Sequence, residues 1–318
     1  MTKSSVKPAL APRAPAWALP TAVVGGLLGA VQARINGELA VQIHDGFTAA
    51  VISFGSGLVI LLVILAVNRR MRQRTVAFVR DLRTGVFPWP MALGGLGGAL
   101  FVLAQGLTVS LLGVALFIVC AVAGQTVTGL AVDRVGLGPG GVRPLTTPRV
   151  VGAGLMVVAA GLAMSSGVRT DVPVLGLVLP MLAGVALGVQ AAINGRVTQA
   201  SGTFLVATLV NFVVGMVALV TAAAVHALVA SGPGRLPSNP LLYLGGAIGV
   251  LFISVASYLA EPLGVLTLAM ATIAGQIVGS VALDALSPGH HLSLMTVAGA
   301  ALTLVAAVIT AGVRSRVA

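Results

Sequence analysis

The sequence predicts an all-α integral membrane protein of ten transmembrane helices, arranged as two inverted five-helix repeats. The first observation is composition: of 318 residues, 58% are hydrophobic and 8% are charged, with a mean hydropathy of +1.08. Soluble domains carry about 25% charged residues, so this chain belongs in a lipid bilayer. The second observation is that apolar runs of about 20 residues fill nearly the whole sequence. The third is an internal repeat.

Glycine, proline and charged residues divide the chain into ten apolar segments. These runs are continuous and lack the alternation of a membrane β-barrel strand, which favours helices. The basic, proline-rich residues 1–16 form a flexible cytoplasmic tail, followed by a first repeat at 17–168 and a second at 169–318. We expect helices at residues 17–40, 47–67, 89–110, 112–132, 149–167, 173–197, 203–229, 241–260, 263–285 and 293–313.

The distribution of basic residues predicts the orientation. One side of the membrane receives 15 of the 18 Lys and Arg residues, while Arg169 and Arg235 fall on the other and Arg34 lies inside the first helix. Because cytoplasmic loops are enriched in Lys and Arg, both termini and the basic segment 68–88 should be cytoplasmic. The net charge of +11 is therefore explained by loops, and we expect no nucleic-acid partner.

The repeat begins with "VQARING" at 31–37, which returns as "VQAAING" at 189–195. Later matches are offset by 158 and then 151 residues, so seven residues of the 68–88 segment have no copy. The matched groups are Ser53-Phe54-x-x-Gly57 with Asn211-Phe212-x-x-Gly215, Leu93-Gly94-Gly95 with Leu244-Gly245-Gly246, Leu112-Gly113-Val114 with Leu263-Gly264-Val265, Gly124-Gln125 with Gly275-Gln276, and Asp133 with Asp284. Five helices per repeat is an odd number, so the second copy must be inverted. Inverted repeats are a recurring transporter design with a substrate site near the midplane.

These motifs resemble a known family. The paired "Q-A-x-I-N-G" segments, the Ser/Asn-Phe-x-x-Gly motif and "AGQTVTGLAVDRVGL" at 123–137 are similar to the YdcZ-like branch of the drug/metabolite transporter superfamily, in a fused two-repeat form from about residue 20 to 313. The resemblance implies an exporter of the bacterial inner membrane. It also implies a central cavity lined mostly by the first four helices of each repeat.

Matched amides are the main candidate site residues. Gln32 and Asn36 share one helix face, as do Gln190 and Asn194, and the two faces should meet. Amides donate and accept hydrogen bonds without the cost of a buried charge, so they suit a substrate cavity. The alternative is that they only join the two helices by hydrogen bonds. The further cavity candidates are Gln125, Gln276, Ser53 and Asn211.

Three acidic residues are candidates for gating or coupling. Asp133 and Asp284 end matched helices, where a carboxylate opposes the helix dipole and calls for a partner such as Arg134 or Arg149. Glu261 precedes Pro262 at the joint of two helices, where capping of a helix start is the simpler interpretation and proton coupling the alternative.

Glycine pairs spaced four apart should allow close helix packing, with a mobile seam as the alternative. They occur at Gly25/Gly29, Gly94/Gly98, Gly184/Gly188 and Gly245/Gly249.

Together these features predict a secondary transporter that exports a small metabolite or amphipathic compound by alternating access. A structural or regulatory membrane protein is the alternative. An enzyme is not expected, because intramembrane residues at catalytic spacing and a nucleotide-binding loop are missing. We expect no metal or cofactor, and the single Cys120 forms no intrachain disulfide. The expected partners are the lipid bilayer and an unknown small-molecule substrate, with a coupling proton and a homodimer left open.

Overall fold

A computed structural model describes residues 15–167, 174–229, 232–286 and 294–312, and within these ranges the chain forms helices and no strands. The helices are α1 (Ala18–Ile43), α2 (Gly46–Val67), α3 (Arg69–Arg83), α4 (Gly95–Val135), α5 (Thr147–Gly167), α6 (Val174–Ser201), α7 (Phe204–Ala227), α8 (Gly245–Leu263), α9 (Val265–Ala285) and α10 (Leu294–Gly312), with short 3-10 turns η1 (Trp89–Ala92) and η2 (Pro240–Tyr243).

All ten apolar segments expected from the sequence are helical where they are described. Seven helical stretches are long and apolar enough to cross a membrane, and one of them, Trp89–Val135, contains two of the expected segments. Shorter apolar helical stretches occur at Thr147–Ala159 and Val297–Ile309, in α5 and α10. The protein is therefore an all-α membrane protein, as predicted.

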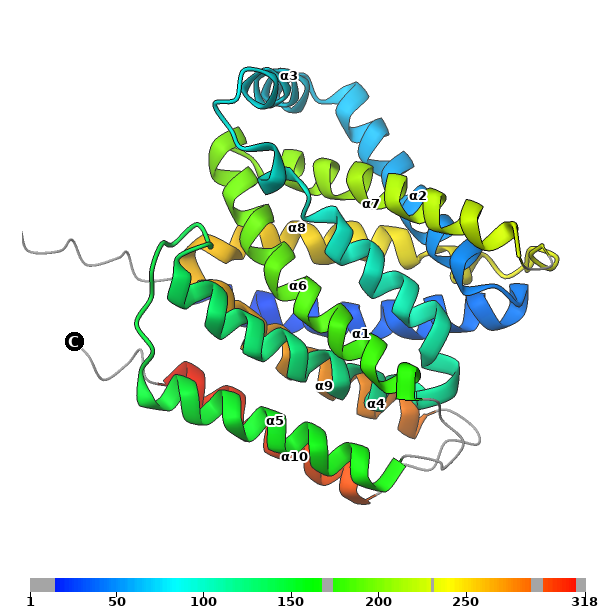
Figure 1. Cartoon of the computed structure of the whole chain (residues 1–318), viewed down its shortest axis with the longest axis vertical. Helices are drawn as coiled ribbons and strands as arrows, with labels where there is room; N and C mark the ends of the chain where they lie inside the picture. Colours follow the sequence, from blue (N-terminus) through cyan, green and yellow to red (C-terminus); the bar gives the residue numbers. More distant parts are fainter. Residues whose placement is uncertain (1–14, 168–173, 230–231, 287–293, 313–318) are drawn as a thin grey trace, which may run out of the picture.

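Four helices, α1, α4, α6 and α9, form the centre of the bundle (Figure 1). The pairs α4 with α6 and α1 with α9 pack along much of their lengths, and α5 pairs with α10 along one edge. Helices α2, α7 and α8 lie on the other side of the centre. Pairing between helices far apart in sequence means that each half of the chain is packed largely against the other.

Two matched glycines, Gly113 within α4 and Gly264 between α8 and α9, interrupt the helical backbone. Gly113 has φ 76° and ψ 166°, and Gly264 has φ 75° and ψ 158°. Side-chain-bearing residues rarely adopt this conformation, which explains why glycine stands at both positions. The break at Gly113 divides α4, so that residues 114–135 form a separate segment, and the break at Gly264 separates α8 from α9.

Close glycine contacts hold the central pairs together. A Cβ atom on Gly184 of α6 would collide with the carbonyl oxygen of Ala121 in α4, and one on Gly26 of α1 would collide with that of Thr272 in α9. The two contacts correspond under the 158- and 151-residue offsets. In α1 the tightest contact is therefore at Gly26, next to the expected pair Gly25/Gly29. Small residues at such positions allow the backbones of membrane helices to approach.

The segment 68–88, expected only as a basic loop, contains a helix. Asn68 accepts a hydrogen bond from the Met71 N–H at 3.0 Å and so caps the start of α3. Met71 and Phe78, seven residues apart on one face, are buried against the bundle. The many arginines of α3 hide this narrow apolar stripe in the sequence, so the helix was not predicted.

Replacing Gly184 by Ala should lower the free energy of unfolding by about 2 kcal/mol or more, since the added methyl group has no space. Gly154→Ala in α5 is the matched control, because nothing lies within 4 Å of the added Cβ there. The control should be neutral or stabilising, as Ala favours helices over Gly. Thermal unfolding in detergent measures both. Equal stability of the two variants would contradict the packing described.

Candidate functional site

A first polar cluster joins α1 to α8, α2 and α4. The Gln32 Nε2 atom donates a hydrogen bond to the Gly245 carbonyl oxygen at 3.0 Å. The Asn36 Nδ2 atom donates to the Gln105 Oε1 atom at 2.7 Å. Ser53 of α2 belongs to the same cluster, because a Cβ on Gly245 would lie 2.9 Å from its hydroxyl oxygen. All four polar side chains are buried.

A second polar cluster occupies the corresponding place in the other half. It contains Gln190 and Asn194 of α6 and Asn211 of α7, all of them buried. The Asn211 Nδ2 atom donates to the Asn194 Oδ1 atom at 3.4 Å. A Cβ on Gly98 of α4 would lie 2.9 Å from the Gln190 Oε1 atom and 3.3 Å from the Asn211 Oδ1 atom.

The glycine pairs on α4 and α8 make room for these amides. Asn194 contacts Gly94 and Gln190 contacts Gly98, whereas Asn36 contacts Gly245 and Gln32 contacts Gly249. Gln32 and Gln190, one from each amide stripe, line the same cavity, but the stripes do not lie directly against each other. Each amide stripe instead faces a glycine pair that belongs to the opposite half, because glycine lets a long polar side chain lie against a helix backbone.

An aromatic pair separates the two clusters. The rings of Phe54 and Phe212 lie with centroids 4.8 Å apart and planes inclined by 34°. Each ring lies over a glycine of the other's helix, since a Cβ on Gly57 would meet Phe212 and one on Gly215 would meet Phe54. This reciprocal contact is the structural reason for the repeated Ser/Asn-Phe-x-x-Gly motif.

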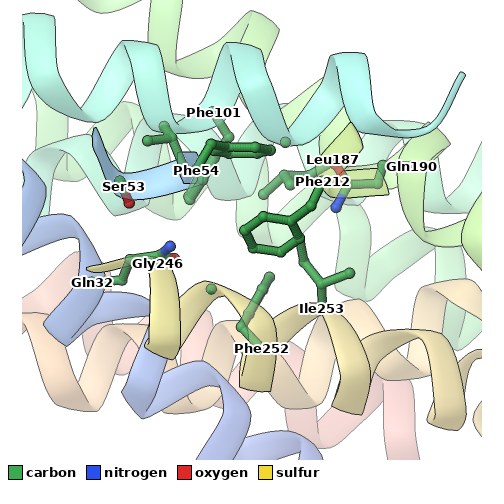
Figure 2. Close-up of a pocket in the computed structure, with 13 residues that line it drawn as sticks. Gln32, Ser53, Phe54, Phe101, Leu187, Gln190, Phe212, Gly246, Phe252 and Ile253 are labelled. Atoms are coloured by element: carbon green, nitrogen blue, oxygen red, sulfur yellow. The ribbon is translucent and has the colours of Figure 1, made fainter. Parts of the chain in front are cut away.

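Two small cavities adjoin at Gln190, which lines both. Cavity A is also lined by Gln32 and Ser53, with the phenylalanine rings between the two ends (Figure 2). Cavity B is also lined by Gln125 and Asn194. The free volume of each is ≈ 20 Å³, which is room for about one water molecule. The free space beside the polar groups is therefore narrow in this conformation.

Several buried polar atoms of the clusters have no hydrogen-bond partner among the described residues. They are Asn36 Oδ1, Ser53 Oγ, Gln105 Nε2, Gln190 Oε1 and Asn211 Oδ1. Most buried polar groups in proteins are paired, so these five atoms, two of them at the matched positions Ser53 and Asn211, call for an explanation such as water or a ligand. Ser53 and Gln190 line cavity A and the other three belong to the two clusters beside it, which marks this region as the candidate binding site.

Not every amide expected at the site lies there. Asn36 and Asn211 belong to the clusters but line neither cavity, and Gln276 packs against Gly29 outside both. Gln105, which accepts from Asn36, was missed by the sequence analysis. A glutamine inside an apolar segment is itself a signal of a polar site. Gln105 was not chosen because its counterpart in the second half is Ala256, and the candidates were polar residues at matched positions in both halves.

The two aspartates cap helices of the opposite half. The Asp133 Oδ2 atom accepts from the Leu266 N–H at 3.2 Å, at the start of α9. The Asp284 Oδ2 atom accepts from the Ala115 N–H at 2.9 Å, just after the break at Gly113. Each carboxylate thus stabilises the positive N-terminal end of a broken helix, an arrangement the sequence analysis did not anticipate.

Only one of the aspartates forms an ion pair within the described residues. Arg149 donates from Nη2 to the Asp133 Oδ2 atom, one of the two partners expected. Asp284 has no such arginine there, and its Oδ1 atom is buried without a hydrogen-bond partner. The two ends of the bundle are therefore secured differently although the capping aspartates correspond.

Arginines tie the Asp133 end together. Arg143 donates to the carbonyl oxygens of Leu263 at 3.1 Å and Glu261 at 3.3 Å, at the end of α8. Arg196 of α6 donates to the Gly136 carbonyl oxygen at 2.8 Å, at the end of α4. Burial lowers the pKa of the Arg143 guanidinium, which Asp133 opposes, but arginine remains charged at neutral pH. Cations at helix C-termini are stabilising.

Glu261 does not cap the start of a helix as expected. It lies in the last turn of α8 with an exposed side chain, because α8 continues through Pro262 to Leu263 and ends at Gly264. The glycine, rather than the proline, sets the break. Glu261 is therefore separate from the buried clusters.

Among the described residues, no three His, Cys, Asp or Glu side chains gather in a way that could hold a metal ion. The lining of both cavities is amide, hydroxyl and apolar.

Comparison with known proteins gives a family. A family model described as "Putative inner membrane exporter, YdcZ" matches residues 17–162 and 175–309. No protein with a curated description matches the chain. A solved structure described only as "Crystal structure of protein" is similar, with 17% sequence identity and a TM-score of 0.59 over 94% of this chain and 96% of that chain. At this identity the similarity concerns the fold alone.

Replacing Asp133 by Asn should lower the free energy of unfolding by about 1–3 kcal/mol, because the amide leaves Arg149 without its counter-charge. Asp81→Asn is the control, since that carboxylate pairs with the exposed Arg80 at the surface, and its effect should stay within about 0.5 kcal/mol. Thermal unfolding and a double-mutant cycle with Arg149→Gln measure the coupling. Additive losses in that cycle would refute a direct Asp133–Arg149 interaction.

Proposed function

Because the chain belongs to the YdcZ family of inner membrane exporters, we propose that it is a secondary transporter that exports a small metabolite or amphipathic compound. The observation that carries the proposal is that buried amides from both halves line adjoining cavities at the centre of the bundle. A transporter site formed at the interface of two halves is accessible from either side when the halves move. Transport rather than catalysis is the activity that this lining supports.

The two halves, 17–168 and 169–318, act in this proposal as inverted repeats of five membrane helices. Corresponding contacts support it: Asp133 with Leu266 matches Asp284 with Ala115, and Phe54 with Gly215 matches Phe212 with Gly57. Each contact and its copy exchange the roles of the two halves, as expected for a two-fold relation.

Alternating access would then require the narrow cavities described above to widen. The Phe54–Phe212 pair separates the polar ends of cavity A and would have to part to admit a solute. Asp133 and Asp284 each hold a helix start of the opposite half, so they are our candidates for gating residues. Glu261 is a weaker candidate, as it is exposed and outside the buried clusters.

The chemistry of the lining indicates the kind of solute. Gln32, Ser53 and Gln190 offer hydrogen bonds at the ends of cavity A, and aromatic rings lie between them. Such a lining suits a compound with an apolar middle and hydrogen-bonding groups. Unpaired acceptor atoms such as Gln190 Oε1 would be satisfied by its N–H or O–H donors.

Replacing Gln190 by Leu should leave the protein folded but reduce transport about tenfold, the equivalent of roughly 1.4 kcal/mol of lost contact. Gln42→Leu is the matched control, since Gln42 is an exposed amide of α1. Efflux of a panel of labelled metabolites from proteoliposomes, normalised to folded protein, makes the measurement. If Gln190→Leu lowers only thermal stability, with transport per folded molecule unchanged, the amide merely joins helices and the site assignment fails.

Labelling of single cysteines in a Cys120→Ala background tests the orientation and the inversion together. Trp17 and Val174, exposed residues at the starts of the two halves, should lie on opposite sides of the membrane. In intact cells an impermeant maleimide should label Val174→Cys, and it should label Trp17→Cys and Gln73→Cys only after permeabilisation. Labelling of Trp17 and Val174 from the same side would exclude inverted repeats.

A further inference from the structure

Helix α3 is the most strongly charged element of the chain. Its 15 residues, "RRMRQRTVAFVRDLR", contain six arginines and one aspartate. All six arginines are exposed, and the Arg80–Asp81 pair at 3.5 Å leaves the arginine side chain 73% exposed. Six arginines against one aspartate leave the helix a net charge of +5. The helix therefore presents a nearly uncompensated positive surface.

The position of α3 places this charge at the membrane boundary. Only Asn68 separates the end of the membrane helix α2 from the start of α3. In Figure 1, α3 is seen along its axis at the edge of the bundle, whereas α2 runs obliquely away from it. The helix therefore turns off a membrane span and lies at the level where that span ends.

One face of α3 is fixed to the protein and the other is free. Met71 and Phe78 are buried, and Phe78 packs with Val197 and Val206 near the turn between α6 and α7. On the outer side, Val76 is 70% exposed between arginines. Alternating apolar and arginine side chains on an exposed helix face are typical of helices that lie in the lipid interface, where long basic side chains reach the headgroups.

From these observations we propose that α3 is a binding site for anionic phospholipid headgroups at the surface of the bilayer around the protein. Arginine donates paired hydrogen bonds to phosphate oxygens, and basic clusters beside membrane spans attract anionic lipids. The valines of the outer face enter the interface beside the lipid chains. Among the described residues of the second half no helix corresponds to α3, and the shorter segment between α7 and η2 contains a single arginine, Arg235. Anionic lipid therefore binds one half only, next to the contact of α2 with α7.

Trp89 provides an internal probe for this lipid. Phe87 packs against Phe78 of α3 with ring centroids 5.1 Å apart, so Trp89, two residues later and 68% exposed, lies close to the helix. The chain has two tryptophans, and Trp17→Phe leaves Trp89 as the only one. Lipid with brominated chains quenches tryptophan fluorescence on contact, and thus reports which lipid occupies the site.

The test reconstitutes the full chain with Trp17→Phe into vesicles that contain either brominated phosphatidylglycerol or brominated phosphatidylcholine. Quenching of Trp89 gives the relative association constant of the two lipids, which should favour phosphatidylglycerol about fivefold. Raising the salt concentration should reduce the preference, because it screens exposed charges.

Variants of Arg69, Arg70 and Arg83 decide between charge and structure. These arginines are exposed, and their side chains form no hydrogen bond or ion pair with the described part of the chain. The triple Gln variant should therefore stay folded and reduce the preference to near unity, while the triple Lys variant should keep most of it. Equal quenching by both lipids, or a preference that survives the Gln substitutions, would overturn the proposal and leave α3 for a soluble acidic partner. None of these residues belongs to the amide site, so the result is independent of the proposed transport.

Discussion

Backbone hydrogen bonding at the helix breaks is the constraint on which the rest of this structure depends. A buried backbone N–H group without an acceptor is costly, so one membrane helix can end and the next begin inside the protein only where another group satisfies the freed N–H. The breaks at Gly113 and Gly264 free such groups, and a carboxylate from the opposite half accepts a hydrogen bond after each. The interruption of each half is thus stabilised by the other half.

Close packing surrounds these contacts. Both carboxylates join α4 to α9, and Gly184 and Gly26 allow α6 to pack closely on α4 and α1 on α9. The glycine pairs on α4 and α8 have a different role from Gly26 and Gly184. They admit amide side chains instead of a second backbone, which places polar groups in an apolar bundle without a buried charge.

The sequence predicted the parts of this structure that depend on local composition. Apolar length placed the ten helical segments, and the repeat identified Gln32 and Gln190, which line the same cavity. It did not predict which surfaces meet, because offsets in sequence carry no information on distance. Glu261 was assigned to a helix start since proline usually marks one, whereas the conformation of Gly264 decided the boundary. Gln105 was missed because its importance lies in a contact with Asn36 and has no counterpart in the copy.

The cap on Ala115 has a consequence for biosynthesis. The acceptor, Asp284, follows 169 residues later in the chain. At about 5–20 residues per second, translation takes roughly 10–30 s to supply it. During that interval the first half is inserted while the helix start after Gly113 still lacks the hydrogen bond to Asp284. The order of synthesis therefore sets the order of assembly. The first half cannot satisfy the Ala115 N–H group itself, and the contact forms only after α9 of the second half has been made.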